Sequence, residues 1–241
     1  MTKGFKGIVS AALMVLACAI SASATPYSFQ AITENDGTGV NGGIGEEQFA
    51  VDVSQQGPDE VLFTFSNTGV DPSSITHVYF SDSGMVRLFT ISQINSGAGT
   101  AFSNPADPQD LPGGDTLVPP FETTFRDEMY FSADSDEPDT IDNGVSPGES
   151  FSIAFTLDAS ATYADVLLGL DLGTLRIGVV GQGFDQELNQ IERDTELGWE
   201  AFINGPATST KLQVPDMGTT VLLLGCALLA LEGLRRHIAA R

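Results

Sequence analysis

The chain has 241 residues, of which 32 are acidic and ten are basic, so its formal net charge at neutral pH is −22. This charge excludes binding to nucleic acid and to anionic lipid, because both require basic patches on the protein. Residues 25–213 hold 30 of the acidic residues and five of the basic ones. This segment contains no cysteine, so it forms no disulfide and its stability must come from its core alone.

The first 24 residues have the order of a secretory signal peptide. Lys3 and Lys6 supply positive charge, residues 8–20 are apolar, and the small residues 22–24 form a cleavage site. The apolar stretch is shorter than the roughly 20 residues that a membrane-spanning helix needs. We predict a signal peptide at 1–24 and export of the rest; an uncleaved anchor or a buried helix are the alternatives.

Residues 25–204 are predicted to form one all-β domain. Apolar and polar residues alternate in several short segments, as in strands with one buried face. The predicted strands are 49–53, 61–65, 75–80, 86–91, 151–157 and 175–180. Turn signals rich in Gly, Pro, Asn and Asp separate them. Short alternating strands of this kind favour an antiparallel β-sandwich ectodomain, with a barrel as the alternative.

One short helix is expected within this domain. Residues 162–165 resemble a capping box, with Asp165 in the place usually taken by Glu or Gln. Val166, Leu167 and Leu170 then form an apolar stripe, and Gly173 is a good helix stop. The pattern predicts two or three helical turns.

An acidic stretch at 132–144 is the strongest candidate for a ligand site. Asp134, Asp136, Asp139 and Asp142 supply carboxylates at short spacing, which a hard cation such as calcium prefers. The spacing does not fit an EF-hand loop, so a solvated acidic loop is the alternative. Calcium is the one cofactor that the sequence suggests.

The sequence does not favour an enzyme. His77 is the one histidine between the two ends of the chain, and no G-x-S-x-G stretch accompanies it. A hydrolase that uses two carboxylates is not excluded by composition, because acidic residues are abundant. Trp199, Tyr79 and Tyr130 are candidates for stacking on sugars, unless they pack in the core.

The end of the chain is predicted to be a membrane anchor. Residues 205–213 read as a linker, and an apolar run within 217–234 is long enough for a short membrane helix. Arg235 and Arg236 follow at once, and clustered arginines favour the cytoplasmic side. The chain would therefore enter the membrane from outside and leave a basic tip inside.

The tail also resembles a known class of sorting signal. Val214, Pro215, Asp216, Gly218 and Thr219, followed by the apolar run and the two arginines, are similar to the PEP-CTERM class at 214–241. The variant that reads Val-Pro-Asp-Ser-Gly (VPDSG) is nearest, with Met217 in the place of Ser. The resemblance implies recognition and cleavage by an exosortase, a membrane-embedded transpeptidase-like enzyme, in Gram-negative bacteria that make extracellular polysaccharide.

These observations lead to one expected function with two alternatives. The resemblance implies a protein that is first anchored in the inner membrane and then delivered to the cell surface or outside the cell. Its expected role is structural or adhesive, in contact with extracellular polysaccharide. The first alternative is a calcium-dependent or glycan-binding module, and the second is a cryptic hydrolase.

Overall fold

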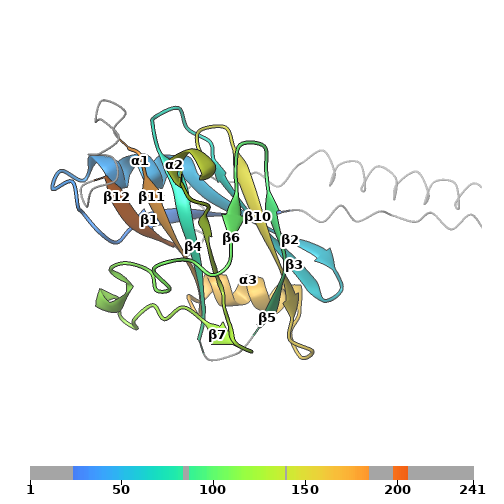
Figure 1. The fold of residues 1–241 in the computed structure, drawn as a ribbon. Coiled ribbons are helices and arrows are strands. Elements are labelled where there is room, and N and C mark those ends of the chain that lie inside the picture. The colour runs from blue at the N-terminus through green and yellow to red at the C-terminus, as the bar shows by residue number, and fades with distance from the viewer. Residues whose placement is uncertain (1–23, 84–86, 139, 185–197, 206–241) are drawn as a thin grey trace, which may run out of the picture.

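The computed structural model describes residues 24–83, 87–138, 140–184 and 198–205 (Figure 1). The elements, in chain order, are β1 (Thr25–Ala31), α1 (Val40–Gln48), β2 (Phe49–Gly57), β3 (Glu60–Asn67), β4 (Ser74–Asp82), β5 (Leu88–Ser96), β6 (Phe102–Ser103), a 3-10 turn (Gly114–Thr116), β7 (Phe125–Arg126), β8 (Met129–Tyr130), β9 (Ser132–Ser135), α2 (Thr140–Asn143), β10 (Ser150–Leu157), α3 (Tyr163–Asp171), β11 (Leu175–Gln182) and β12 (Trp199–Asn204).

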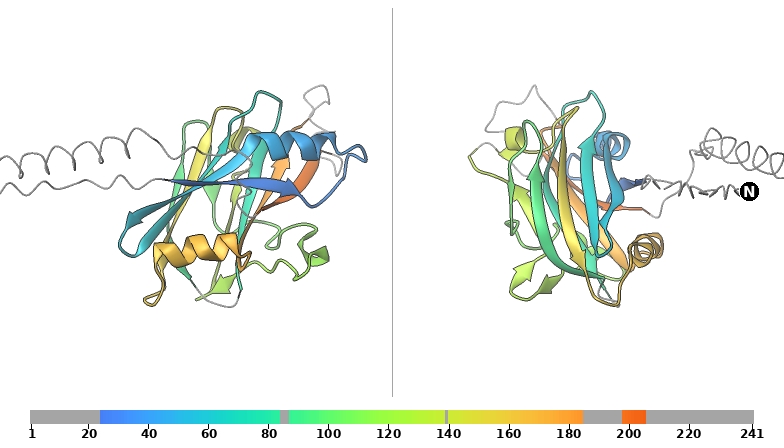
Figure 2. Two further views of the ribbon diagram at one scale, coloured as in Figure 1. Left: turned by 180° about the vertical axis from the view of Figure 1, so that it is seen from behind. Right: turned by 90° about the vertical axis from the view of Figure 1, so that its right-hand side faces the viewer.

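Strand β1 joins the two halves of one ten-stranded antiparallel sheet. Residues 25–28 pair with β2, whereas residues 29–31 pair with β12. The strand order is β5-β10-β3-β2-β1-β12-β11-β4-β9-β6. Because β1 passes from one half to the other, the two halves form two layers that face each other (Figures 1 and 2). A small hairpin, β7-β8, forms a separate two-stranded sheet.

Phenylalanine side chains fill the space between the layers. The ring of Phe80 on β4 lies 5.0 Å from that of Phe63 and 6.1 Å from that of Phe65, both on β3, and 4.8 Å from that of Phe155 on β10. All four side chains are completely buried. The ring planes cross at angles between 66° and 77°, the edge-to-face arrangement that aromatic rings favour. This aromatic core stabilises the described domain without a disulfide.

The predicted strands are confirmed. Five of them lie within β2, β3, β4, β10 and β11, and the sixth overlaps β5. On β3 the alternation has the expected effect: Phe63 and Phe65 are buried, while Thr64 between them is half-exposed. Strand β11 differs, because seven of its eight residues are buried. Its side chains are therefore covered on both faces of the sheet.

The predicted helix is α3, and its capping box is present. The amide of Asp165 donates to Thr162 Oγ1 (3.3 Å), and the amide of Thr162 donates to Asp165 Oδ2 (2.9 Å). The expectation of a single helix was wrong, because α1 and α2 are also present. Helix α1 carries three glycines and has no side-chain cap, so it gives no helix signal. A Cβ on Gly45 would overlap the ring of Phe202, so the packing requires glycine there.

The antiparallel β class is confirmed, with one difference from the expected sandwich. Strand β1 makes the two layers continuous, so they are not two separate sheets. Among the residues that the structure describes, no helix is long and apolar enough to cross a bilayer. The predicted membrane helix at 217–234 and the predicted signal peptide, but for its final residue, lie outside the described residues.

Residues 104–124, here called the cover loop, pack on the outer face of the layer that contains β12, β11, β4, β9 and β6. Arg176 on β11 anchors this loop by donating to the carbonyl oxygens of Pro119 (2.8 Å) and Pro120 (2.5 Å). Its guanidinium also lies 5.1 Å from the centre of the Phe121 ring. A second buried apolar cluster, separate from the core between the layers, joins the cover loop to the sheet. It consists of Tyr79, Ala106, Leu111, Phe121, Val180 and Ala201. The cover loop therefore explains why β4 and β11 are buried on both faces.

The central position of Phe80 predicts a large effect of its removal on stability. We expect Phe80→Ala to lower the free energy of unfolding by about 3–5 kcal/mol, because the cavity lies between two layers that cannot readily collapse. Val118→Ala is the control, since the Val118 side chain is 98% exposed. Urea titration followed by circular dichroism measures both variants. Equal stabilities for the two would contradict the assignment of Phe80 to the centre of the core.

Candidate functional site

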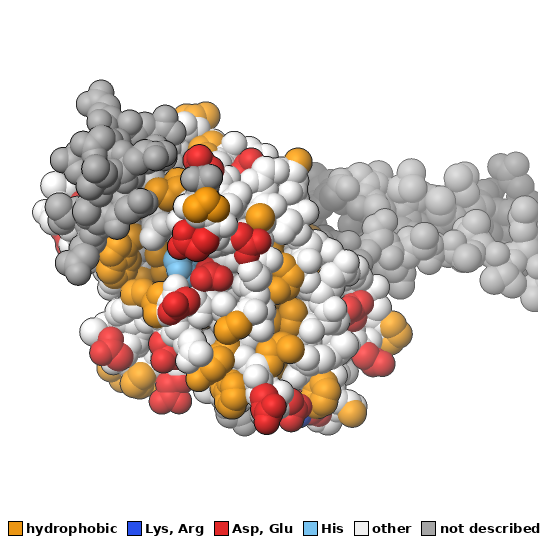
Figure 3. Space-filling view, viewed as in Figure 1, with side chains coloured by type: hydrophobic (Ala, Val, Ile, Leu, Met, Phe, Trp, Pro, Cys, Tyr) orange, Lys and Arg blue, Asp and Glu red, His pale blue; other side chains and the backbone are white. Residues whose placement is uncertain are grey.

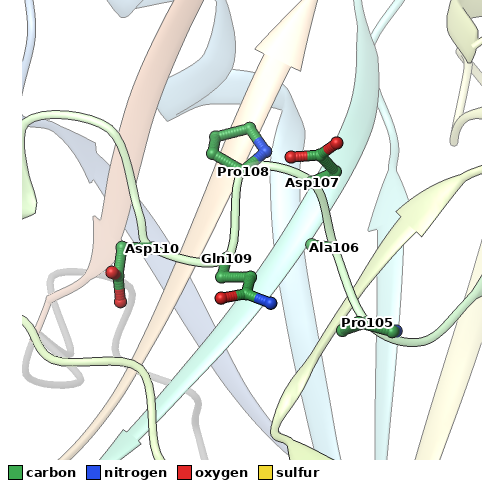
Figure 4. A pocket seen from close by; sticks show the side chains of 6 residues that line it. All are labelled: Pro105, Ala106, Asp107, Pro108, Gln109 and Asp110. Carbon is green, nitrogen blue, oxygen red and sulfur yellow. The ribbon is translucent and has the colours of Figure 1, made fainter.

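The cover loop forms a shallow acidic pocket on the surface. The pocket has a volume of about 520 Å³ and is lined by six consecutive residues, Pro105, Ala106, Asp107, Pro108, Gln109 and Asp110. The loop turns at Pro108, so that Asp107 and Asp110 lie on either side of the turn (Figure 4). A neighbouring hollow of about 540 Å³ shares Pro108 and Asp110 and includes Phe121 and Glu122. Both hollows therefore present carboxylates and apolar rings together.

Hydrogen bonds from the sheet hold this part of the loop in place. The hydroxyl of Tyr79 donates to the carbonyl oxygen of Pro108 (2.9 Å). The amide of Asp107 donates to Asp134 Oδ2 (3.0 Å), and the amide of Ala106 donates to Ser132 Oγ (3.2 Å). Strands β4 and β9 thus fix the pocket through both backbone and side-chain contacts.

His77 lies beneath the pocket and bonds through both ring nitrogens. Nε2 lies 3.2 Å from the carbonyl oxygen of Asp107, and Nδ1 lies 2.9 Å from Thr76 Oγ1. Because a carbonyl only accepts, Nε2 carries the proton in the neutral ring and Nδ1 accepts from Thr76. The imidazole also stacks on the ring of Tyr79, with an interplanar angle of 9°. In Figure 3 this histidine is surrounded by several carboxylates.

Burial shifts the protonation of His77 and of the carboxylate beside it. Desolvation lowers the pKa of His77, although the carbonyl of Asp107 and the charges of Asp134 and Asp107 act in the opposite direction. Desolvation raises the pKa of Asp134, against its hydrogen bond from Asp107 and the attraction of His77. Both groups are therefore biased toward their neutral forms.

The contacts of His77 do not form a hydrolytic site. Thr76, the hydroxyl that faces its Nδ1, is completely buried, so a substrate does not reach it. A catalytic triad requires an exposed nucleophile beside the histidine. The ring instead connects β4 to the cover loop, which is the position of a structural histidine.

Three of the four aspartates predicted to bind calcium lie among the described residues, and they do not form a metal-binding group there. Asp134 lies on β9 and bonds to the cover loop, Asp136 accepts from the hydroxyl of Ser103, and Asp142 lies in α2. Asp139 lies outside the described residues. Among described residues, no three His, Cys, Asp or Glu side chains are placed to hold a metal ion. Calcium binding stays a prediction.

The aromatic residues named from the sequence have different environments. Tyr79 is completely buried, and Trp199 packs, half-buried, against the second cluster. Tyr130 on β8 is half-buried and pairs across the hairpin with Phe125, which is 56% exposed. Phe125 has no strand signal in the sequence, because its strand, β7, is only two residues long.

The residues of the predicted sorting motif, Val214, Pro215, Asp216, Gly218 and Thr219, lie outside the described residues, as do Arg235 and Arg236. The structure does show where the chain leaves the domain. The amide of Gly205 donates to the carbonyl oxygen of Ser28 (3.2 Å), directly after β12. The chain therefore leaves the domain beside β1, the strand that begins at Thr25.

Comparison with known proteins bears on the tail. Residues 213–238 match the family model described as the VPDSG-CTERM motif. The chain carries a VPDSG-CTERM sorting tail. This is a PEP-CTERM-like tail of the kind that exosortases process, which confirms the resemblance found in the sequence. The VPDSG-CTERM match is confined to the end of the chain, so it does not assign a role to the β domain. No curated protein and no solved structure matches the chain.

The lowered pKa of His77 predicts how its contribution to stability depends on pH. Folding disfavours the imidazolium, so this contribution is complete above the usual pKa near 6.5 and is lost as the pH falls below it. We expect the stability advantage of the wild type over His77→Gln to be smaller at about pH 5.5 than at about pH 7.5. The raised pKa of Asp134 acts in the opposite direction and at lower pH.

Urea titrations of both proteins at the two pH values measure this difference. The comparison cancels the contributions of the many carboxylates that the two proteins share. An advantage of the same size at both pH values would show that the protonation of His77 is not linked to folding.

Proposed function

We propose that this chain is an exported cell-surface or extracellular-matrix protein that is delivered through an exosortase-type system. The observation that carries the proposal is the VPDSG-CTERM match at 213–238. The order of the tail supports it: a proline-containing motif, an apolar run and a pair of arginines. Each part has a separate physical task, namely recognition, membrane insertion and orientation.

The proposed route begins with the signal peptide at 1–24 and passes through the inner membrane. In this route the predicted helix at 217–234 holds the protein there, with Arg235 and Arg236 on the cytoplasmic side. Pro215 lacks an amide hydrogen and keeps its neighbour extended, which is the conformation that an enzyme cleft can bind. Cleavage at the tail then releases the domain to the surface or the outside.

In this proposal the β domain has a structural or adhesive role against extracellular polysaccharide, not a catalytic one. Its core is filled by aromatic packing, and residues 25–213 contain no cysteine that could form a disulfide. Its net negative charge favours solubility and repels other polyanions. The buried hydroxyl of Thr76 and the engaged nitrogens of His77 support the absence of hydrolytic chemistry at that histidine.

Substitution of Pro215 tests the route. We expect Pro215→Ala to accumulate uncleaved protein in the inner membrane of the native host, because the motif loses its rigid extended residue. Pro206→Ala is the matched control, since it makes the same change in the linker outside the motif. Intact mass spectrometry of membrane and extracellular fractions locates the C-terminus of each variant.

The wild type and Pro206→Ala should lose the tail to the same extent. A wild-type protein that keeps residues 214–241 in the inner membrane would overturn the proposed route. Equal cleavage of Pro215→Ala and wild type would show that Pro215 is not part of the recognised motif.

A further inference from the structure

The β7-β8 hairpin has two faces that differ in character. Its cross-strand pairs are Phe125 with Tyr130 and Arg126 with Met129. Successive residues of a strand point to opposite faces, so the two aromatic residues share one face and Arg126 and Met129 share the other. The hairpin is therefore aromatic on one side only.

The face that carries Arg126 is attached to β5. Arg126 Nη1 donates to the carbonyl oxygen of Leu88 (3.3 Å), and the guanidinium lies 4.5 Å from the centre of the Phe89 ring. Arg126 Nη2 also donates to Asp158 Oδ2 (3.2 Å). With this face fixed against the sheet, the opposite face is turned outward.

The outward face carries two aromatic rings, of which Phe125 is exposed and Tyr130 is half-buried. We call Phe125 and Tyr130 the aromatic platform. The rings lie 4.6 Å apart with planes tilted by 44°. Phe125 is 56% exposed, although exposure of an aromatic ring to water is unfavourable. Together with the half-buried ring of Tyr130, it forms a larger apolar surface than a single exposed side chain does, and contiguous apolar surface marks binding sites.

The turn of the hairpin adds carboxylates and backbone strain. Asp127 and Glu128 both have positive φ, of 50° and 66°. Asp accepts this left-handed conformation readily, whereas Glu rarely adopts it. Such turns normally use Asn-Gly or Asp-Gly. A strained, acidic turn beside one exposed ring and one half-buried ring is the kind of outlier that suggests a functional position.

We propose that the aromatic platform binds an uncharged pyranose polysaccharide, with Asp127 and Glu128 accepting hydrogen bonds from sugar hydroxyls. Rings with exposed faces stack on the apolar face of a sugar, and a few polar groups set its orientation. The carboxylates of the turn, in a chain of net charge −22, exclude acidic polysaccharides. This inference rests on the proposed function, because it requires the domain to be outside the cell.

The size of the platform favours a sugar over a protein partner. Two aromatic side chains contribute at most about 500 Å² of contact area. A stable protein interface needs about 800 Å² from each partner. One or two sugar units stacked on the rings need no more surface than the hairpin provides.

Titration calorimetry of the full-length protein in detergent tests the site. The probes are two neutral glucans, cellohexaose and dextran, and the acidic polymer polygalacturonate. We expect at least one neutral glucan to bind. Phe125→Leu, which keeps an apolar side chain but removes the ring, should raise its Kd at least about tenfold. Phe125→Trp should restore binding. Val118→Ala, which alters another exposed apolar residue, should bind as the wild type does.

The melting temperature of each variant shows that it is folded, since Phe125 lies outside both buried clusters. Failure of both neutral glucans to bind, an unchanged Kd in Phe125→Leu, or stronger binding of polygalacturonate would each overturn the platform proposal. Tail cleavage in the native host is measured separately. If the tail is cleaved and no glucan binds, the proposed route stands and only the binding site is wrong.

Discussion

The pairing of β1 with both β2 and β12 is the constraint on which the rest of the domain depends. It brings Phe29 opposite Asn204, so residues near the two ends of the described domain become neighbours. It also buries Tyr27 and Phe29 and makes two layers into one sheet. Contacts between residues so distant in sequence carry a large loop-closure entropy, which the burial of these side chains has to offset.

This closure also separates the β domain from the sorting tail. The β domain is complete at Gly205, whose amide bonds to β1, and the sorting motif begins nine residues later. The motif and the domain are joined only by the predicted linker, so a processing enzyme can bind the tail while the domain stays folded. On the domain, the aromatic platform lies on the β7-β8 hairpin, which is separate from the ten-stranded sheet.

The sequence was informative where one local pattern determines the structure. Alternation placed β2, β3 and β10, because each has one face toward the core, and a capping box placed α3. Helix α1 escaped prediction because packing of Gly45 against Phe202 overrides its poor helix propensity. The two-sided burial of β11 depends on the cover loop, which is far away in sequence.

The sorting tail and the aromatic platform differ in the same way: one is a contiguous pattern in the sequence, and the other depends on how the hairpin packs. The sorting tail was recognised because its motif, apolar run and arginines are contiguous, and the comparison confirmed it. Of the aromatic platform, Tyr130 was named as a candidate for stacking on sugars, but Phe125 was not. The Asp-Glu turn that joins them lacks the usual hairpin residues, so the sequence did not pair the two rings. The outward direction of Phe125 follows only from the attachment of Arg126 to β5.

Hydrogen–deuterium exchange of the protein tests directly whether β1 and β12 hold the domain closed. The account predicts that their paired amides, at residues 29–31 and 202–204, exchange only through global unfolding, as slowly as those of β3 and β10. Exchange of these amides as fast as that of an exposed loop would show that β1 does not close the sheet, and would contradict the account.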